Sequence, residues 1–136
     1  MSLDSKEMKY KNWAPEIWQL VERLLAETQG QKRVAAFDAD GTLWDTDLGE
    51  SFFKYQIREK LLSDLPENPW EHYRKWKASG DPRPAYLWLA QINAGHTLDE
   101  VRSWTEDHLR SLGRLPIFPD QKKLVSLFQD HGVEVY

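Results

Sequence analysis

The sequence lacks cysteine, an excess of basic residues and any long apolar run. Without cysteine, the chain can form neither a disulfide framework nor a thiolate metal site. Its 18 Lys and Arg against 22 Asp and Glu leave a net charge of −4, so electrostatics give no reason to expect a nucleic acid or an anionic membrane surface as a partner. No apolar run approaches the ~20 residues that a membrane-spanning helix needs.

The start of the chain also lacks the apolar core of a signal peptide. Residues 1–13, MSLDSKEMKYKNW, are largely polar, which favours a cytoplasmic protein. The same start would remain after an export signal had been removed, and that alternative stays open. The chain has the length and balance of one ordinary globular domain, with 136 residues, 40% of them hydrophobic and 29% charged, and it contains seven tryptophans.

Apolar spacing and helix-ending residues predict an alternation of helices and strands. Residues 14–30 carry apolar side chains on one helical face and end on glycine, which predicts a helix. Residues 33–38, RVAAFD, are apolar on both faces, as is typical of a strand in a buried parallel sheet. Four helical segments follow, the last of them opened by a Thr97–Glu100 capping box. Residues 116–136 then contain a helix and the start of a second strand, VEVY.

This order predicts an α/β fold, in which a small helical domain is inserted after the first strand of one βαβ crossover. The predicted division is residues 1–45 for the first part of the core, 46–115 for the helical insertion and 116–136 for the return to the core. The second strand is expected to lie beside the first and parallel to it, because sequential strands joined by a crossover usually do so, with a right-handed connection.

Two carboxylates, Asp38 and Asp40, stand where the first strand ends. In an open α/β sheet, ligands bind outside the carboxyl ends of the strands. The two side chains can converge there if the chain turns sharply, and Gly41 supplies the backbone freedom for such a turn. The alternative is a plain tight loop in which the acids only form the turn. Asp45 and Asp47 extend the acidic stretch; they are expected to be loop acids, and the alternative is that they contact the substrate.

The stretch FDADGTLW, residues 37–44, resembles the first motif of the haloacid dehalogenase (HAD) superfamily, D-x-D-x-T at the end of the first strand. Residues 115–136 are similar to that superfamily's return from a helical cap, in which a helix leads into the second strand. The resemblance implies a HAD-like Rossmannoid parallel sheet, of which only the first two strands are present, with an inserted α-helical cap at residues 46–115.

For the chemistry, the resemblance implies an aspartyl-phosphate mechanism. Asp38 would be the nucleophile that attacks phosphorus. Asp40 would be the general acid that protonates the leaving alcohol and then the base that activates water. A carboxylate facing a phosphate needs a divalent cation, and Mg²⁺ would be held by the Asp38 side chain and the Asp40 backbone carbonyl. Thr42 would orient the nucleophile, while backbone N–H groups of the turn at Gly41 would hold the phosphoryl oxygens.

Asp40 also separates reactions within the superfamily, because cleavage of a carbon–halogen bond needs no acid for the leaving group. We therefore expect a Mg²⁺-dependent phosphomonoester hydrolase, a phosphatase that acts on a small phosphorylated metabolite. Two alternatives stay open. One is a phosphotransferase or mutase that uses the same intermediate, and the other is a non-catalytic module that only binds a partner or a metal.

The aromatic residues of the insertion bear on the substrate. The chain resembles phosphoserine and phosphocholine phosphatases of the superfamily, the latter in D-x-D-x-T-L-W and in an acid nearby in the cap. This likeness implies that Trp44 and one or two cap aromatics form a wall for a quaternary ammonium group, whose charge Glu50 would neutralise. The alternative is that the aromatics fill the core of a small helical bundle.

The resemblance also implies residues that this sequence does not supply: a Ser or Thr after the second strand, a later Lys or Arg, and more acids for the metal. We therefore expect a chain truncated before the second motif and inactive by itself. Its open sheet edge would expose Val133 and Val135 and permit self-association. The histidines show no metal-ligand spacing and are expected to be solvated or to cap helices: His72, His96, His108 and His131.

Overall fold

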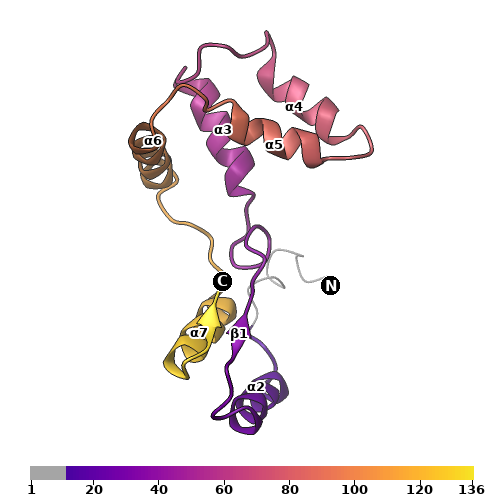
Figure 1. The fold of residues 1–136 in the computed structure, drawn as a ribbon, viewed down its shortest axis with the longest axis vertical. Helices are drawn as coiled ribbons and strands as arrows, with labels where there is room; N and C mark the ends of the chain where they lie inside the picture. The colour runs from indigo at the N-terminus through magenta and orange to yellow at the C-terminus, as the bar shows by residue number, and fades with distance from the viewer. Residues whose placement is uncertain (1–11) are drawn as a thin grey trace, which may run out of the picture. The chain divides into compact units, whose positions relative to one another are not determined.

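The structure is a computed structural model that describes residues 12–136, and the chain divides into two compact units (Figure 1). The first, which we call the sheet unit, joins the residues up to Thr46 with Pro116–Tyr136. The second, which we call the helical unit, is Asp47–Leu115. Each boundary lies within one residue of the division that the sequence predicts.

Within residues 12–46 and 116–136, the sheet unit contains a small parallel sheet and two helices. Its elements are α2 (Pro15–Glu27), β1 (Val34–Ala35), α7 (Pro119–Asp130) and β2 (Glu134–Val135). The strands are parallel neighbours, with Val34 paired to Glu134, which confirms the predicted pairing. The ladder continues past β1, because the N–H of Phe37 donates to the carbonyl of Tyr136 at 2.8 Å. Asp38 therefore follows directly after a residue that is still bonded to the neighbouring strand.

β1 is shorter and more exposed than the sequence predicts. The apolar pattern predicts burial on both faces, but Val34 is 57% exposed. The physical reason is that β1 has one neighbouring strand in the described part of the chain, so much of its surface stays uncovered. Contact with α7 covers part of the strand's end, where the rings of Phe37 and Phe128 lie 6.2 Å apart.

The exposed apolar side chains at the strands also differ from the prediction. Val133 is buried and Val135 is half-buried, whereas Val34 and Tyr136 are the exposed ones. The prediction that Val133 and Val135 form an exposed edge is therefore wrong, because Val133 lies under the turn that follows α7 and its N–H donates to Phe128. Self-association through the sheet stays a prediction.

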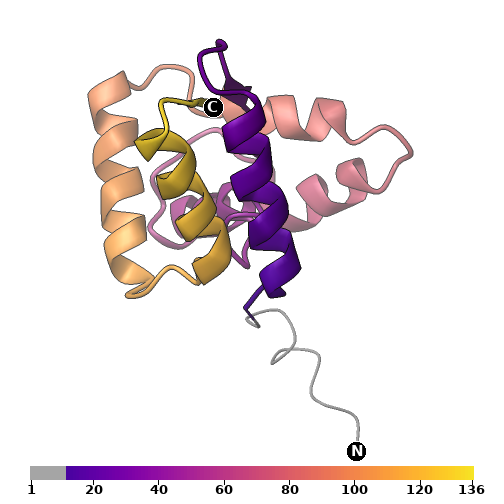
Figure 2. The same ribbon diagram turned by 90° about the horizontal axis from the view of Figure 1, so that it is seen from below.

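The helices α2 and α7 lie side by side in the sheet unit (Figure 2). α2 begins at Pro15, as predicted from the place of that proline. Leu25 of α2 and Leu124 of α7 are both buried. The ammonium group of Lys123 lies 4.1 Å from the ring centroid of Trp18. This cation–π contact joins the two helices.

The helical unit contains four helices, as predicted: α3 (Leu48–Arg58), α4 (Pro69–Lys77), α5 (Arg83–Gln91) and α6 (Leu98–Ser111). Its core is formed by Phe53, Tyr73 and Ala85, each at most 1% exposed. Trp70 and Trp88 pack against these residues. For these aromatics, the structure confirms the bundle-core alternative.

Local signals set the ends of two helices. α6 begins with the predicted capping box, in which the N–H of Glu100 donates to Thr97 Oγ1 at 3.2 Å and the N–H of Thr97 donates to the Glu100 carboxylate at 2.7 Å. α3 ends at Arg58. The helix cannot continue much farther, because Lys60, two residues later, adopts a left-handed φ of 55°. No helix within residues 12–136 combines the length and the hydrophobicity of a membrane-spanning segment.

His108 differs from its prediction. His108 is 4% exposed, and neither nitrogen of its ring has a hydrogen-bond partner in the described part of the chain. The ring lies 5.1 Å from the ring centroid of Tyr55 and 5.9 Å from that of Phe52, both on α3. The expectation that all histidines are solvated or cap helices is therefore wrong for His108, because α6 turns it toward α3. His131, in contrast, is the C-cap residue of α7.

Candidate active site

The two predicted catalytic acids lie in a tight loop that follows β1, residues 38–46, which we call the acid loop. Asp38 and Asp40 are both exposed. Two backbone N–H groups, those of Thr42 and Leu43, donate to the carbonyl of Ala39 at 3.1 and 2.8 Å. Gly41 has a φ of +76°, the left-handed conformation that glycine adopts without steric cost. The predicted sharp turn at Gly41 is thus confirmed.

The acid loop is held by the segment that returns to the sheet unit. The N–H of Asp45 donates to Pro116 at 2.8 Å, and the N–H of Phe118 donates to Leu43 at 3.0 Å. Between these bonds, Trp44 forms an antiparallel bridge with Ile117. The loop is therefore supported at its base by β1 and farther along by residues 116–118.

Each acid accepts a hydrogen bond from the side chain four residues later. Thr42 Oγ1 donates to Asp38 Oδ2 at 2.9 Å. Trp44 Nε1 donates to Asp40 Oδ1 at 2.7 Å. The predicted bond between Thr42 and the candidate nucleophile is present, whereas the bond from Trp44 was not predicted. Both donors are neutral groups, and a hydrogen bond from such a donor is stronger to an ionised carboxylate than to a neutral acceptor.

A hollow of about 340 Å³ adjoins the acid loop. On one side it is lined by Gly41, Thr42 and Asp45, and on the other by Trp13 and the first residues of α7. Neither Asp38 nor Asp40 lines this hollow. Sequence reasoning did not place Trp13 or the start of α7 beside the acid loop. The sequence offers one signal, the position of residues 116–119 at the start of the helix that returns to the sheet. That position does not specify a contact with the acid loop.

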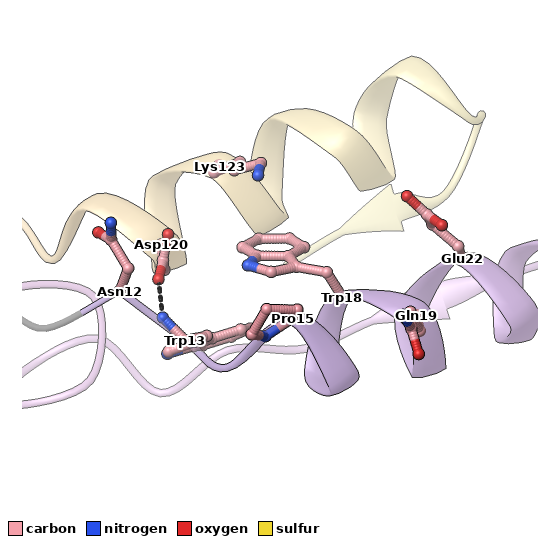
Figure 3. Close-up of a pocket in the computed structure, with 8 residues that line it drawn as sticks. All are labelled: Asn12, Trp13, Pro15, Trp18, Gln19, Glu22, Asp120 and Lys123. Carbon is pink, nitrogen blue, oxygen red and sulfur yellow. Dashed lines mark hydrogen bonds between the residues drawn. The ribbon is translucent and has the colours of Figure 1, made fainter.

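A second hollow, of about 450 Å³, lies between the start of α2 and α7 (Figure 3). The rings of Trp13 and Trp18 stack beside it with centroids 5.2 Å apart. In Figure 3, Lys123 lies over the ring of Trp18, and the backbone N–H of Trp13 points to the carboxylate of Asp120, to which it donates. None of the residues predicted for the active site lines this hollow.

Glu50, the predicted contact for a cationic substrate, belongs to the helical unit. Its carboxylate accepts hydrogen bonds from Lys77 at 2.5 Å and from the hydroxyl of Tyr73 at 3.2 Å. The hydrogen bond to Glu50 raises the pKa of Lys77. Burial, followed by the charge of Glu50, raises the pKa of Tyr73 to about 12. Asp47, predicted as a loop acid, caps α3 by accepting the N–H of Glu50 at 2.8 Å.

The acid loop carries oxygen donors of the type that Mg²⁺ prefers, the carboxylate of Asp38 and the backbone carbonyl of Asp40. The described residues contain no group of three or more His, Cys, Asp or Glu that could hold a metal. The donor type therefore matches Mg²⁺, but the number of donors in the described residues is small.

Comparisons of the chain with protein-family models, with curated proteins and with solved structures found no match. The case for a function therefore depends on the residues of the acid loop and on the strand that carries them.

Proposed function

We propose that the protein is a Mg²⁺-dependent phosphatase that acts on a small phosphorylated metabolite through an aspartyl-phosphate. In this proposal the sheet unit is the start of a HAD-like sheet and the helical unit is its inserted cap. The observation that carries it is the acid loop, in which two carboxylates follow a parallel strand and each receives a side-chain hydrogen bond. A cytoplasmic location is part of the same proposal.

The reaction follows from the chemistry of the two acids. A carboxylate oxygen of Asp38 attacks phosphorus, and the bond from phosphorus to the leaving oxygen breaks while Asp40 gives its proton to that oxygen. Water then attacks the phosphorus of the aspartyl-phosphate and gives a proton to Asp40. Inorganic phosphate leaves, and Asp38 is a carboxylate again. Bound Mg²⁺ would offset the charge repulsion between Asp38 and the phosphoryl group.

Support also comes from the shape of the acid loop. Its backbone turns through Gly41 beside a hollow that reaches Thr42 and Asp45. A concave site with a few convergent polar groups is the usual form of a small-molecule site. Thr42 restrains the Asp38 carboxylate by its 2.9 Å hydrogen bond, so the nucleophile is held in one orientation before substrate arrives.

The test is covalent labelling rather than turnover, because the resemblance implies further catalytic groups that are not assigned in this chain. The 136-residue chain is incubated with Mg²⁺ and acetyl phosphate, and its intact mass and peptide map are recorded. We expect one phosphoryl group on Asp38, labile to hydroxylamine. The variant Asp38→Asn should take up none.

Two further variants complete this experiment. Asp130→Asn changes an exposed acid at the end of α7 and should be labelled at the wild-type rate. Asp40→Asn should be labelled but lose the label slowly, because the base that activates water is missing. A label that formed on Asp38 but passed to an added alcohol instead of water would favour the phosphotransferase alternative. Absence of any label would contradict the proposal and favour a non-catalytic binding module.

A further inference from the structure

We infer that Trp44 is the positioning residue of Asp40, whose carboxyl group its indole N–H holds for proton transfer. The proton transfer in this inference rests on the proposed function. The positioning rests on the 2.7 Å hydrogen bond from Trp44 Nε1 to Asp40 Oδ1. This role differs from the substrate wall that the sequence predicts for Trp44.

The bond is one of two matching hydrogen bonds in the acid loop. Thr42 donates to Asp38 and Trp44 donates to Asp40, in each case from the fourth residue after the acid. The acids are two residues apart, and so are their donors. The stretch DADGTLW thus supplies each acid with a side-chain donor of its own. The Thr42 bond restrains the candidate nucleophile, and the Trp44 bond restrains the group that handles the proton.

The backbone around Trp44 makes it a well-placed donor. The N–H of Gly41 donates to the carbonyl of Trp44 at 2.8 Å, which closes the turn between the acid and its donor. Trp44 also pairs with Ile117 in the antiparallel bridge to the returning segment. The backbone of Trp44 is therefore fixed on two sides, and the residue is half-buried, while Asp40 is exposed. An exposed carboxylate without such a donor would sample several rotamers.

An indole suits this position because it is a hydrogen-bond donor only. When Asp40 is a carboxylate, Oδ1 accepts the indole hydrogen as a charged oxygen. When Asp40 carries a proton on its other oxygen, Oδ1 still accepts as a carbonyl oxygen. The bond is therefore compatible with both protonation states, and the carboxyl group keeps its orientation while it gives and takes a proton. Indole neither supplies nor removes a proton in this cycle.

The first test compares the indole N–H signals of the nitrogen-15-labelled 136-residue chain with those of two variants, by NMR at one fixed pH. The chain has seven tryptophans, and the signal that disappears in Trp44→Phe belongs to Trp44. In Asp40→Ala we expect this signal to move upfield and its hydrogen to exchange faster with solvent, because the indole N–H loses its acceptor. The other indole signals report whether each variant stays folded. A Trp44 signal with the same position and exchange rate in Asp40→Ala would overturn the inference.

The second test uses the phosphoryl label on Asp38. Acetyl phosphate has a leaving group that needs no acid, so the loss of the label is followed separately from its formation and is compared per labelled chain. Loss of the label needs Asp40 as base, and here we expect Trp44→Phe to be roughly tenfold slower than wild type, since general acid–base catalysis supplies about 10²–10⁴-fold and misorientation forfeits part of it. Trp104→Phe, a change in the helical unit, should match wild type.

The outcomes separate the inference from the proposed function. Wild-type loss of the label by Trp44→Phe would overturn the positioning role and leave the aspartyl-phosphate chemistry intact. If no chain were labelled, the proposed function would fail, and the indole signal of Trp44 in Asp40→Ala would still decide whether Trp44 donates to Asp40.

Discussion

Lys77 holds its ammonium group among two carboxylates and two tyrosine rings. Its Nζ lies 2.5 Å from Glu50 and 3.9 Å from Asp47, and 5.8 and 5.4 Å from the ring centroids of Tyr73 and Tyr86. Anionic oxygens and aromatic faces are what an ammonium group prefers. A quaternary ammonium substrate that used Glu50 would therefore compete with Lys77 for the same carboxylate.

Replacing Glu50 by Gln should lower the pKa of Tyr73 below its value of about 12. Burial, the first cause of the raised pKa, persists in the variant, but the negative charge of Glu50 is removed, so tyrosinate becomes easier to form. Tyrosinate absorbance in an alkaline titration measures the change. Because the chain has five tyrosines, Tyr73→Phe identifies the responsible component. An unchanged titration would contradict the contact between Glu50 and Tyr73.

A buried amide pair joins two segments of the helical unit. Gln56 of α3 is 1% exposed, and its Nε2 donates to Asn93 Oδ1 at 2.7 Å. Asn93, just beyond α5, donates in turn to the carbonyl of Leu89 at 3.0 Å. The two amides thus connect the middle of α3 to the end of α5 beside the apolar core.

The variant Asn93→Ala should lower the free energy of unfolding by about 1–3 kcal/mol, the usual cost of leaving a buried polar group unpaired. The reason is that the buried amide of Gln56 loses its acceptor. Urea denaturation followed by tryptophan fluorescence measures the loss. Gln91→Ala, at an exposed position near the end of α5, is the matched control and should change stability by no more than ~0.5 kcal/mol. Equal effects in the two variants would show that the amide pair adds nothing specific.

The contact of α6 with α3 depends on a neutral His108. Burial, and then the nearby charge of Arg58, lowers the pKa of His108 below its usual value. The unfolded chain, in which this histidine has its ordinary pKa of about 6.5, binds the proton more readily than the folded chain. Acid therefore favours unfolding, and the stability of the helical unit should fall as the pH drops below ~6.5.

His108→Phe should remove much of this dependence, because a neutral ring of similar shape replaces the titrating one among Phe52 and Tyr55. Thermal unfolding by circular dichroism at neutral and mildly acidic pH measures the difference. His131→Gln changes an exposed histidine of the sheet unit and is the control that should keep the wild-type dependence. If His108→Phe lost stability in acid as steeply as wild type, His108 would not be the responsible group.

The 136-residue chain should not hydrolyse p-nitrophenyl phosphate with Mg²⁺ at an enzymatic rate. One carboxylate and one backbone carbonyl leave most of the octahedral shell of Mg²⁺ to water, and such sites are weak. No Lys or Arg is assigned to neutralise the phosphoryl oxygens, and loss of one such electrostatic group typically costs on the order of 10²–10³ in rate. The assay compares wild type with Asp38→Asn. Robust turnover that required Asp38 would show that the catalytic site is more complete than the assigned residues.

Much of the fold was predictable because its signals are local. Pro15 at the start of α2, the capping box of α6 and the turn at Gly41 each involve residues a few positions apart. The parallel pairing of the strands was also predictable, since β-branched runs on either side of a crossover seldom pair in another way. The exposure of Val34 was not predictable, because it depends on how many strands lie beside β1.

For the candidate site, the sequence by itself determined the acid loop. The acids and their donors lie within one short stretch, so the turn alone brings Thr42 to Asp38 and Trp44 to Asp40. Only the tertiary structure decided which distant residues surround this loop and which predicted site residues already form ion pairs or hydrogen bonds elsewhere.

Three contacts show what had to come from packing. Trp13 lines the hollow beside Gly41, Lys77 forms an ion pair with Glu50, and an aromatic ring of α3 packs against His108. Each joins residues far apart in the chain, and neither helical spacing nor turn chemistry constrains such a pair. Its existence depends on how whole helices bury their apolar faces, a free energy summed over many side chains.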